Sequence, residues 1–274
     1  MNALVKEIKN EILTDKNTAL WYLGQVGFIV KSRNSVIAID PYLSDYVDKN
    51  CCSKDVLWER LYPAPCSGSD LSFLDAVICT HAHFDHADPW TLSKIAKANP
   101  NTKFIVPTPI VETIAQYGID INNIIYARAG KVIELGDFKI TPVPSAHEEF
   151  HIDENGDYFE LGYIIDDGVN KIFHAGDMCP YDGLISRIKQ AEVVILPVNG
   201  RDDERRSKDI IGNFLLEEAV SIANELSAFF IPVHHDLYAI NGVEPEKIIN
   251  SVKDIAPSLN YKIFKVGEKL LLNK

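Results

Sequence analysis

Short apolar runs separated by polar turns dominate the first half of the chain. Their lengths and the turn residues between them predict strands at residues 19–22, 27–31, 36–39, 74–79 and 103–106. Apolar residues at helical spacing predict helices at residues 89–98 and 109–117. Asp88 can cap the first of these helices, and Gly118 follows the second, where helices commonly end.

The second half of the chain repeats this style. A hairpin is predicted at residues 131–143, with Gly136 and Asp137 in its turn. Further strands are predicted at residues 158–165, 171–173, 193–198 and 229–233, and amphipathic helices at residues 214–226 and 245–255. The last apolar stretch, residues 262–272, predicts a closing pair of strands around Gly267.

In each half, strands come first and helices come later. That order is typical of an α/β (α+β) fold in which two sheets pack face to face with helices outside. The chain has 274 residues, of which 46% are hydrophobic, which suffices for one large domain or two small ones. No long linker and no short repeat interrupts it.

The formal net charge of −12 argues against nucleic acid as a partner, because such a surface repels phosphate backbones. A small anionic substrate stays open, since a few arginines in a cleft can override the global sign. No segment is apolar for long enough to span a bilayer, and the N-terminus carries no secretion signal. The five cysteines show no CxxC spacing, which indicates reduced thiols and a cytoplasmic location.

The most informative segment is the one that follows the strand predicted at residues 74–79. It contains His81, His83, Asp85 and His86 within six residues. If the segment is extended, His81 and His83 point the same way and can reach one metal ion, while Asp85 and His86 lie beyond the bend, near a second ion. Imidazole and carboxylate groups suit zinc, iron and manganese.

Other predicted strands also end in residues that can bind a metal ion. They are followed by Asp40, by His147, by His174 and Asp177, and by His234, His235 and Asp236. Strand ends along one edge of a sheet converge, so we expect these side chains to gather at one rim. Several strand ends with ligand-type residues favour a metal site more strongly than one motif does.

These residues resemble the pattern of the metallo-β-lactamase superfamily of metal-dependent hydrolases, over most of the chain. The resemblance implies a single domain, residues 1–274, with an αββα sandwich fold and the site at one edge of the two sheets. It implies that His81, His83 and His147 hold one ion, that Asp85, His86 and His234 hold the other, and that Asp177 bridges both. His234 or His235 could be the last ligand; we favour His234, the first residue past the strand.

Within the superfamily, four segments resemble the L-ascorbate-6-phosphate lactonase family: residues 21–27, 75–77, 173–177 and 231–237. The resemblance implies a hydrolase that opens a lactone or ester of a small, anionic, sugar-phosphate-like substrate with a metal-activated hydroxide. The cofactor would be two divalent ions, manganese or zinc, with iron also compatible with these ligands. A homo-oligomer is compatible with the sequence.

We expect Asp85, Asp177 and His235 to take part in catalysis. His235, Asp236 and Tyr238 are the candidates for a general acid. For binding an anion we name Arg201, Arg205 and Tyr238, because Arg201 follows an apolar strand and should lie on the same rim as Asp177; a solvated charged turn is the simpler interpretation of both arginines. Trp90 is the tryptophan with the best claim to line the pocket.

Three other functions fit the same fold. If the protein were a ribonuclease or phosphodiesterase, we would expect a basic groove, which the net charge of −12 disfavours. An iron-dependent oxidoreductase would use the same ligands, so analysis of the bound metal separates it from a hydrolase. A non-catalytic metal-binding or sensing protein would be favoured if ligand positions were substituted, and none is.

Overall fold

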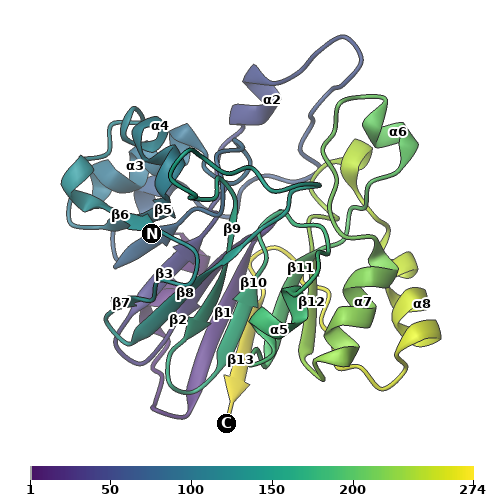
Figure 1. Cartoon of the computed structure of the whole chain (residues 1–274). Helices are drawn as coiled ribbons and strands as arrows, with labels where there is room; N and C mark the ends of the chain where they lie inside the picture. Colours follow the sequence, from purple (N-terminus) through teal and green to yellow (C-terminus); the bar gives the residue numbers. More distant parts are fainter. Residues whose placement is uncertain (1) are drawn as a thin grey trace.

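The computed structural model describes residues 2–274, and in it two β-sheets lie face to face with helices on both outer sides (Figure 1). The first sheet has the strand order β13-β1-β2-β3-β4-β5-β6. Its strands are β1 (Asn17–Gly24), β2 (Gly27–Lys31), β3 (Val36–Ile39), β4 (Ala76–Ile78), β5 (Lys103–Pro107), β6 (Ile124–Ala127) and β13 (Lys269–Asn273). This is the two-sheet α/β arrangement predicted from the sequence.

The second sheet has the order β12-β11-β10-β9-β8-β7. Its strands are β7 (Ile133–Leu135), β8 (Phe138–Pro144), β9 (Leu161–Asp166), β10 (Lys171–His174), β11 (Val193–Pro197) and β12 (Phe229–Val233). The helices are α1 (Ala3–Asn10), α2 (Tyr46–Asn50), α3 (Pro89–Ala98), α4 (Val111–Ala115), α5 (Leu184–Ile188), α6 (Asp203–Arg206), α7 (Leu216–Glu225) and α8 (Pro245–Ile255). Short 3₁₀ turns lie at Gly68–Asp70, Thr108–Ile110, Ile121–Asn123 and Ala239–Asn241.

Strand direction decides which ends meet. In the first sheet, β3 through β6 are parallel, and in the second sheet β10, β11 and β12 are parallel. β8 pairs antiparallel with β9, and β9 pairs antiparallel with β10, so β8 runs in the same direction as β10. The carboxyl ends of β8, β10, β11 and β12 therefore lie along one edge of their sheet.

Most central strands are buried on both faces, which explains their continuous apolar runs. In β1, Leu20 and Tyr22 point into the core between the sheets, while Ala19, Trp21 and Leu23 join the outer core that α1, α3 and α4 cover. Residues of α5, α7 and α8 pack on the outer face of the second sheet. Because successive side chains of a strand point to opposite faces of the sheet, one strand contributes residues to both cores.

The predicted closing strand pair around Gly267 is wrong. Only β13 forms, and it pairs with β1, while Tyr261 makes a single bridge to Phe230. The apolar segment before Gly267 contributes to the core instead, because Phe264 packs against Tyr22 and Phe28 between the sheets. The helix predicted at residues 109–117 is shorter and begins with a 3₁₀ turn, and α1 and β6 were not predicted.

No helix within residues 2–274 is both long enough and apolar enough to cross a membrane.

Phe28 offers a test of the core between the sheets. The residue is fully buried and its ring contacts Tyr22, Phe264 and His174. We expect Phe28→Ala to lower the free energy of unfolding in urea by about 3–5 kcal/mol, because it leaves a cavity that the two sheets cannot close. The matched control is Ile12→Ala, at a side chain that is 90% exposed. Its change should stay within about 0.5 kcal/mol, and equal losses in both variants would contradict this account of the core.

Candidate metal centre

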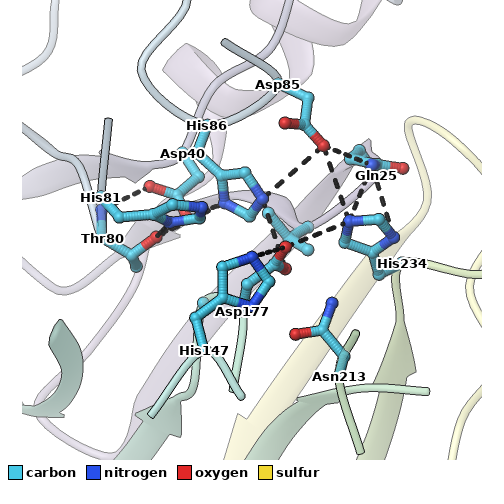
Figure 2. A network of polar contacts seen from close by, with 12 residues as sticks. Gln25, Asp40, Thr80, His81, Asp85, His86, His147, Asp177, Asn213 and His234 are labelled. Carbon is cyan, nitrogen blue, oxygen red and sulfur yellow. Dashed lines mark hydrogen bonds and ion pairs between the residues drawn. The ribbon is translucent and has the colours of Figure 1, made fainter. Parts of the chain in front are cut away.

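Ligand-type side chains follow the carboxyl ends of five strands and meet at one edge of the two sheets (Figure 2). Asp40 follows β3, and the segment with His81 follows β4. His147, Asp177 and His234 follow β8, β10 and β12. This convergence is the one that the apolar runs predicted.

The first group contains His81, His83, His147 and Asp177, each of which offers one ligand atom; these atoms all lie within 4.8 Å of one another. The ring centroids of His81 and His83 are 4.5 Å apart. The route to this proximity differs from the prediction, because residues 80–82 are bent rather than extended. The turn, not strand alternation, brings the two imidazoles together.

The second group contains Asp85, His86 and His234, again with ligand atoms within 4.8 Å of one another. Asp177 lies between the groups. Its Oδ1 is 3.3 Å from Nε2 of His86, and its Oδ2 is 3.4 Å from Nε2 of His234 and 3.6 Å from Nε2 of His147. The seven side chains named as ligands in the sequence are thus brought together, with Asp177 in the bridging place.

Hydrogen bonds at Nδ1, on the side of the ring away from the centre, orient the imidazoles of His86 and His147. Asp40, fully buried, accepts from the backbone N–H of Thr80 at 2.8 Å, from the Thr80 hydroxyl at 2.6 Å and from Nδ1 of His86 at 2.8 Å. His147 donates from Nδ1 to the carbonyl of Gly212 at 3.1 Å. Both bonds leave Nε2 facing the centre, which is the arrangement that metal-binding histidines require.

The segment that carries Asp177 is held by further contacts. Ser145 donates to the Asp177 carbonyl at 2.6 Å, and the next residue, Met178, donates its N–H to the side chain of Asn213 at 2.8 Å. His174 is not a ligand: its Nε2 donates to the Val26 carbonyl at 2.7 Å, and its Nδ1 accepts from the N–H of Gly176 at 3.1 Å. His174 therefore fixes the turn that aims Asp177.

Glycine is required in that turn. Gly176 has φ +64°, and a Cβ there would lie 2.6 Å from the side chain of Thr80. Because Thr80 also donates to Asp40, any larger residue would disturb both the turn and the support of His86.

The two groups differ in their electrostatics. Burial lowers the pKa of His147 to about 4 and holds the pKa of His81 well below its ordinary value. For His86, burial by itself lowers the pKa, but the carboxylates of Asp177 and Asp85 outweigh it and raise the pKa well above its ordinary value. Asp177 likewise overcomes burial at His234 and raises its pKa to about 9. Without metal, the carboxylates of the second group thus keep His86 and His234 protonated, and a metal ion would replace those protons, whereas the first group already offers neutral imidazoles.

Buried polar atoms without partners test whether a metal fits. Among the described side chains, ten buried nitrogen and oxygen atoms make no hydrogen bond, and three of them are Nε2 of His81, Nε2 of His86 and Oδ1 of Asp177. All three belong to the ligand groups. An unpaired buried acceptor is costly, so these atoms fit divalent metal ions, for which imidazole nitrogen and carboxylate oxygen are usual ligands.

Gln25 was missed as a site residue. Its Nε2 donates to Oδ2 of Asp85 at 2.8 Å and lies 3.1 Å from Nε2 of His234, while its carbonyl accepts from the His234 N–H at 2.8 Å. Gln25 and His234 both have φ of 59°. The turn between β1 and β2 therefore reaches the second group. The sequence signal was the placement of Gln25 between two glycines.

The candidates for a general acid are placed differently. His235 is buried, both its ring nitrogens lack partners, and it does not line the cavity beside the centre. Asp236 accepts from the hydroxyls of Tyr22 and Tyr62, each at 2.9 Å. Tyr238 does line the cavity, where its hydroxyl lies 2.9 Å from that of Tyr42. Of the three, only Tyr238 is positioned to meet a substrate.

The arginines expected to bind an anion have partners within the protein. Arg201 forms a bidentate ion pair with Glu218, at 2.7 and 2.6 Å, and donates to the Asn213 carbonyl. Arg205 pairs with Asp202 and donates to Asn241 at 2.9 Å. Arg205 lines a separate cavity of about 560 Å³, between the end of β11 and helices α7 and α8, that contains no ligand residue. The structure gives the anion-binding prediction no support at either position.

A cavity of about 210 Å³ adjoins both ligand groups. His83, Asp85, His147, Asp177 and His234 form its metal side. Trp58 lines it, whereas Trp90, the tryptophan predicted to do so, packs against Tyr46 outside it. Trp58 comes from the long segment between α2 and β4, whose course the sequence pattern did not indicate.

Residues 36–235 match the family model of the beta-lactamase superfamily domain. The chain therefore belongs to this superfamily, and its two sheets flanked by helices are the fold of that group.

A curated relative, the UPF0173 metal-dependent hydrolase of Aeropyrum pernix, is 23% identical over 267 residues, which cover 91% of this chain and 95% of the relative. Igni18, a metallo hydrolase of Ignicoccus hospitalis, has a TM-score of 0.67 and 22% identity over 94% of this chain and 99% of its own. An isothiocyanate hydrolase from Delia radicum gut bacteria has a TM-score of 0.72 and 16% identity, with 93% and 99% covered. These two structures show a shared fold.

The support of His86 by Asp40 can be tested. We expect Asp40→Asn to weaken divalent-metal affinity about 10- to 100-fold, because the acceptor that orients His86 and raises its basicity is lost. Affinity is measured by competition with a chromogenic chelator, after circular dichroism shows that the fold is kept. Asp203→Asn, at a fully exposed carboxylate, is the control. Equal affinities in the two variants would exclude this role for Asp40.

The pKa of His234 predicts how stability depends on pH without metal. Its folded pKa of about 9 lies above the ordinary 6.5, so the stabilisation is complete below pH 6.5 and is lost as pH rises through about 9. With chelator present, the unfolding free energy should fall over this window by at most about 3 kcal/mol from this group.

The variant His234→Gln should show a shallower fall in unfolding free energy. His151→Gln, which removes an imidazole outside both ligand groups, is the matched control. A slope that is the same in all three proteins would show that His234 does not carry this proton.

Proposed function

We propose that this protein is a metal-dependent hydrolase that opens a lactone or ester bond of a small molecule. The observation that carries the proposal is the pair of ligand groups, joined through Asp177, beside a cavity of about 210 Å³. The names of curated relatives such as the Aeropyrum pernix protein, metal-dependent hydrolase, support the reaction class. The choice of a lactone as the proposed substrate rests on the resemblance of four sequence segments to a lactonase family.

The chain's own residues would do the following. His81, His83 and His147 would hold one ion and Asp85, His86 and His234 the other, with Asp177 shared. Divalent ions in such a site supply a nucleophilic hydroxide at neutral pH and polarise the carbonyl oxygen. Zinc, manganese and iron all fit the donor set, and two ions match the two groups.

Tyr238 is the proposed donor to the leaving oxygen. Burial raises its pKa far above the ordinary value, so the phenol keeps its proton and acts as a hydrogen-bond donor rather than as a base. Without substrate the Tyr238 hydroxyl lies 2.9 Å from that of Tyr42 and donates to Oδ2 of Asp48 at 3.1 Å, so its O–H would turn from Asp48 to the leaving oxygen when substrate binds. His235 does not line the cavity and both its ring nitrogens lack partners, so its part in catalysis stays a prediction from the sequence.

Cytoplasmic location, a small anionic substrate without nucleic-acid or membrane partners, and a homo-oligomeric state stay predictions from the sequence.

The bridging position gives a direct test. We expect Asp177→Ala to lose at least one bound ion per chain and all hydrolysis, because the carboxylate of Asp177 lies 3.3–3.6 Å from ligand nitrogens of both groups. Elemental analysis gives the metal content, and a screen of lactones, carboxylic esters, thioesters and phosphodiesters gives the activity.

Asp182→Ala removes an exposed carboxylate five residues further along and is the control. It should keep both metal and turnover. Full metal content and full activity in Asp177→Ala would refute the proposal. If the unmodified protein hydrolyses none of these substrates and Asp177→Ala still loses metal, the protein binds metal but lacks the proposed activity.

A further inference from the structure

Among residues 2–274, neither a lysine nor an arginine lines the cavity beside the metal centre, and every histidine in its wall belongs to a ligand group. Apart from the ligands, the only charged side chain in the wall, among residues 2–274, is that of Asp209, which is acidic. A phosphate or carboxylate on a substrate would therefore find no ion pair apart from the metal ions, whose charge Asp85 and Asp177 already offset in part.

The arginines near this edge are held away from the cavity by partners of their own. Arg201 is paired with Glu218, and Arg205 with Asp202 and Asn241. Arg60 donates to the Ser44 and Tyr62 carbonyls at 2.6 and 3.3 Å and stacks on the ring of Tyr42; its Nη2 is buried without a partner, but the residue does not line the cavity. Each would have to break a formed ion pair or hydrogen bond to reach an anionic substrate, so none is a ready anion binder.

Among residues 2–274, the side chains in the wall that are not ligands are largely apolar. Val47 from α2 and Trp58 from the segment after it form one part, Phe84 forms another, and Ile210 and Ile211 form a third. Ile211 and Phe84 are 43% and 37% exposed, so large apolar side chains stand at the opening, where solvent contact is unfavourable for them unless a ligand covers them.

One loop joins the apolar wall to the metal centre. Residues 209–211 line the cavity, and the next residue, Gly212, accepts from Nδ1 of His147 at 3.1 Å. Arg201 holds the following carbonyl, that of Asn213, at 3.0 Å. The pairing of Arg201 with Glu218 therefore braces the loop that presents Ile210 and Ile211, which gives this arginine a positioning role in place of anion binding.

From the charge and the lining of this cavity we infer that the substrate is electrically neutral and carries a small apolar group that rests on Ile210 and Ile211. The inference rests on the proposed function and names its substrate class: a neutral alkyl-substituted lactone or ester rather than a sugar phosphate. A volume of about 210 Å³ limits the substrate to a small molecule. Discrimination would come from the missing cation and from Asp209, which repels an anion.

Matched lactones test the substrate class on the metal-loaded protein. In γ-valerolactone a methyl group occupies the ring position that bears a carboxylate in 5-oxotetrahydrofuran-2-carboxylate. We expect kcat/KM for the neutral lactone to be at least about tenfold higher, because the carboxylate loses its hydration without gaining a partner. Equal values, or a preference for the carboxylate, would overturn the inference.

Matched lactams separate this inference from the proposed reaction, since they bind without being opened. Affinities of 5-methyl-2-pyrrolidone and pyroglutamate are measured by calorimetry. Tighter binding of the neutral lactam, together with no opening of either lactone, would support the inference and refute the proposed hydrolysis. Tighter or equal binding of pyroglutamate, or no binding of either lactam, would overturn the inference.

A charge placed in the wall provides the reciprocal test. Ile211→Arg should reduce the preference for the neutral lactam about tenfold or reverse it, because it supplies the absent cation at a side chain that is already partly exposed. Ile12→Arg adds the same charge at a 90% exposed position after α1 and should leave the preference unchanged. An equal shift in both variants would show that net charge, not the cavity wall, decides between the ligands.

Discussion

The structure depends on keeping the carboxylate of Asp177 buried among histidines. Only 5% of this residue is exposed, and burial alone would favour its neutral form, yet His234 and His86 hold its pKa well below the ordinary value. Such a cluster of desolvated charges is stable only when geometry supplies the compensating contacts. These contacts come from the residues at the strand ends, from the tight turn at Gly176 and from the hydrogen bonds at Nδ1 of the imidazoles.

The support comes from parts of the chain that are far apart in sequence. Asp40 and Thr80 hold His86, the turn between β1 and β2 holds His234 through Gln25, and the loop after α6 holds His147 through Gly212. Asp40, Thr80 and Gln25 follow or join strands whose register is set by the two cores, whereas Gly212 lies in the loop between α6 and α7, which Arg201 holds at the Asn213 carbonyl. The sheets thereby hold the metal ligands in fixed positions, as a preorganised site requires.

The cavity combines this charged edge with a neutral wall. The ligands come from strand ends, whereas most of the apolar wall comes from the segment around α2 and from residues 209–211; Phe84 lies between two ligands. Metal chemistry and substrate choice are thus carried largely by separate parts of the chain. Loops of this kind can change without disturbing the sheets, which is how one fold serves many reactions.

By itself, the sequence determined the two sheets, the strand ends that carry the ligands, and the identity of the ligand candidates, because apolar runs and the residues directly after them are local signals. Only the tertiary structure decided that His234 rather than His235 joins the second ligand group, that Arg201 pairs with Glu218, and that Trp58 lines the cavity. It also showed that Phe264 fills the core between the sheets instead of forming a strand. These outcomes depend on contacts between segments up to hundreds of residues apart, and no local pattern encodes which partners a loop side chain will meet.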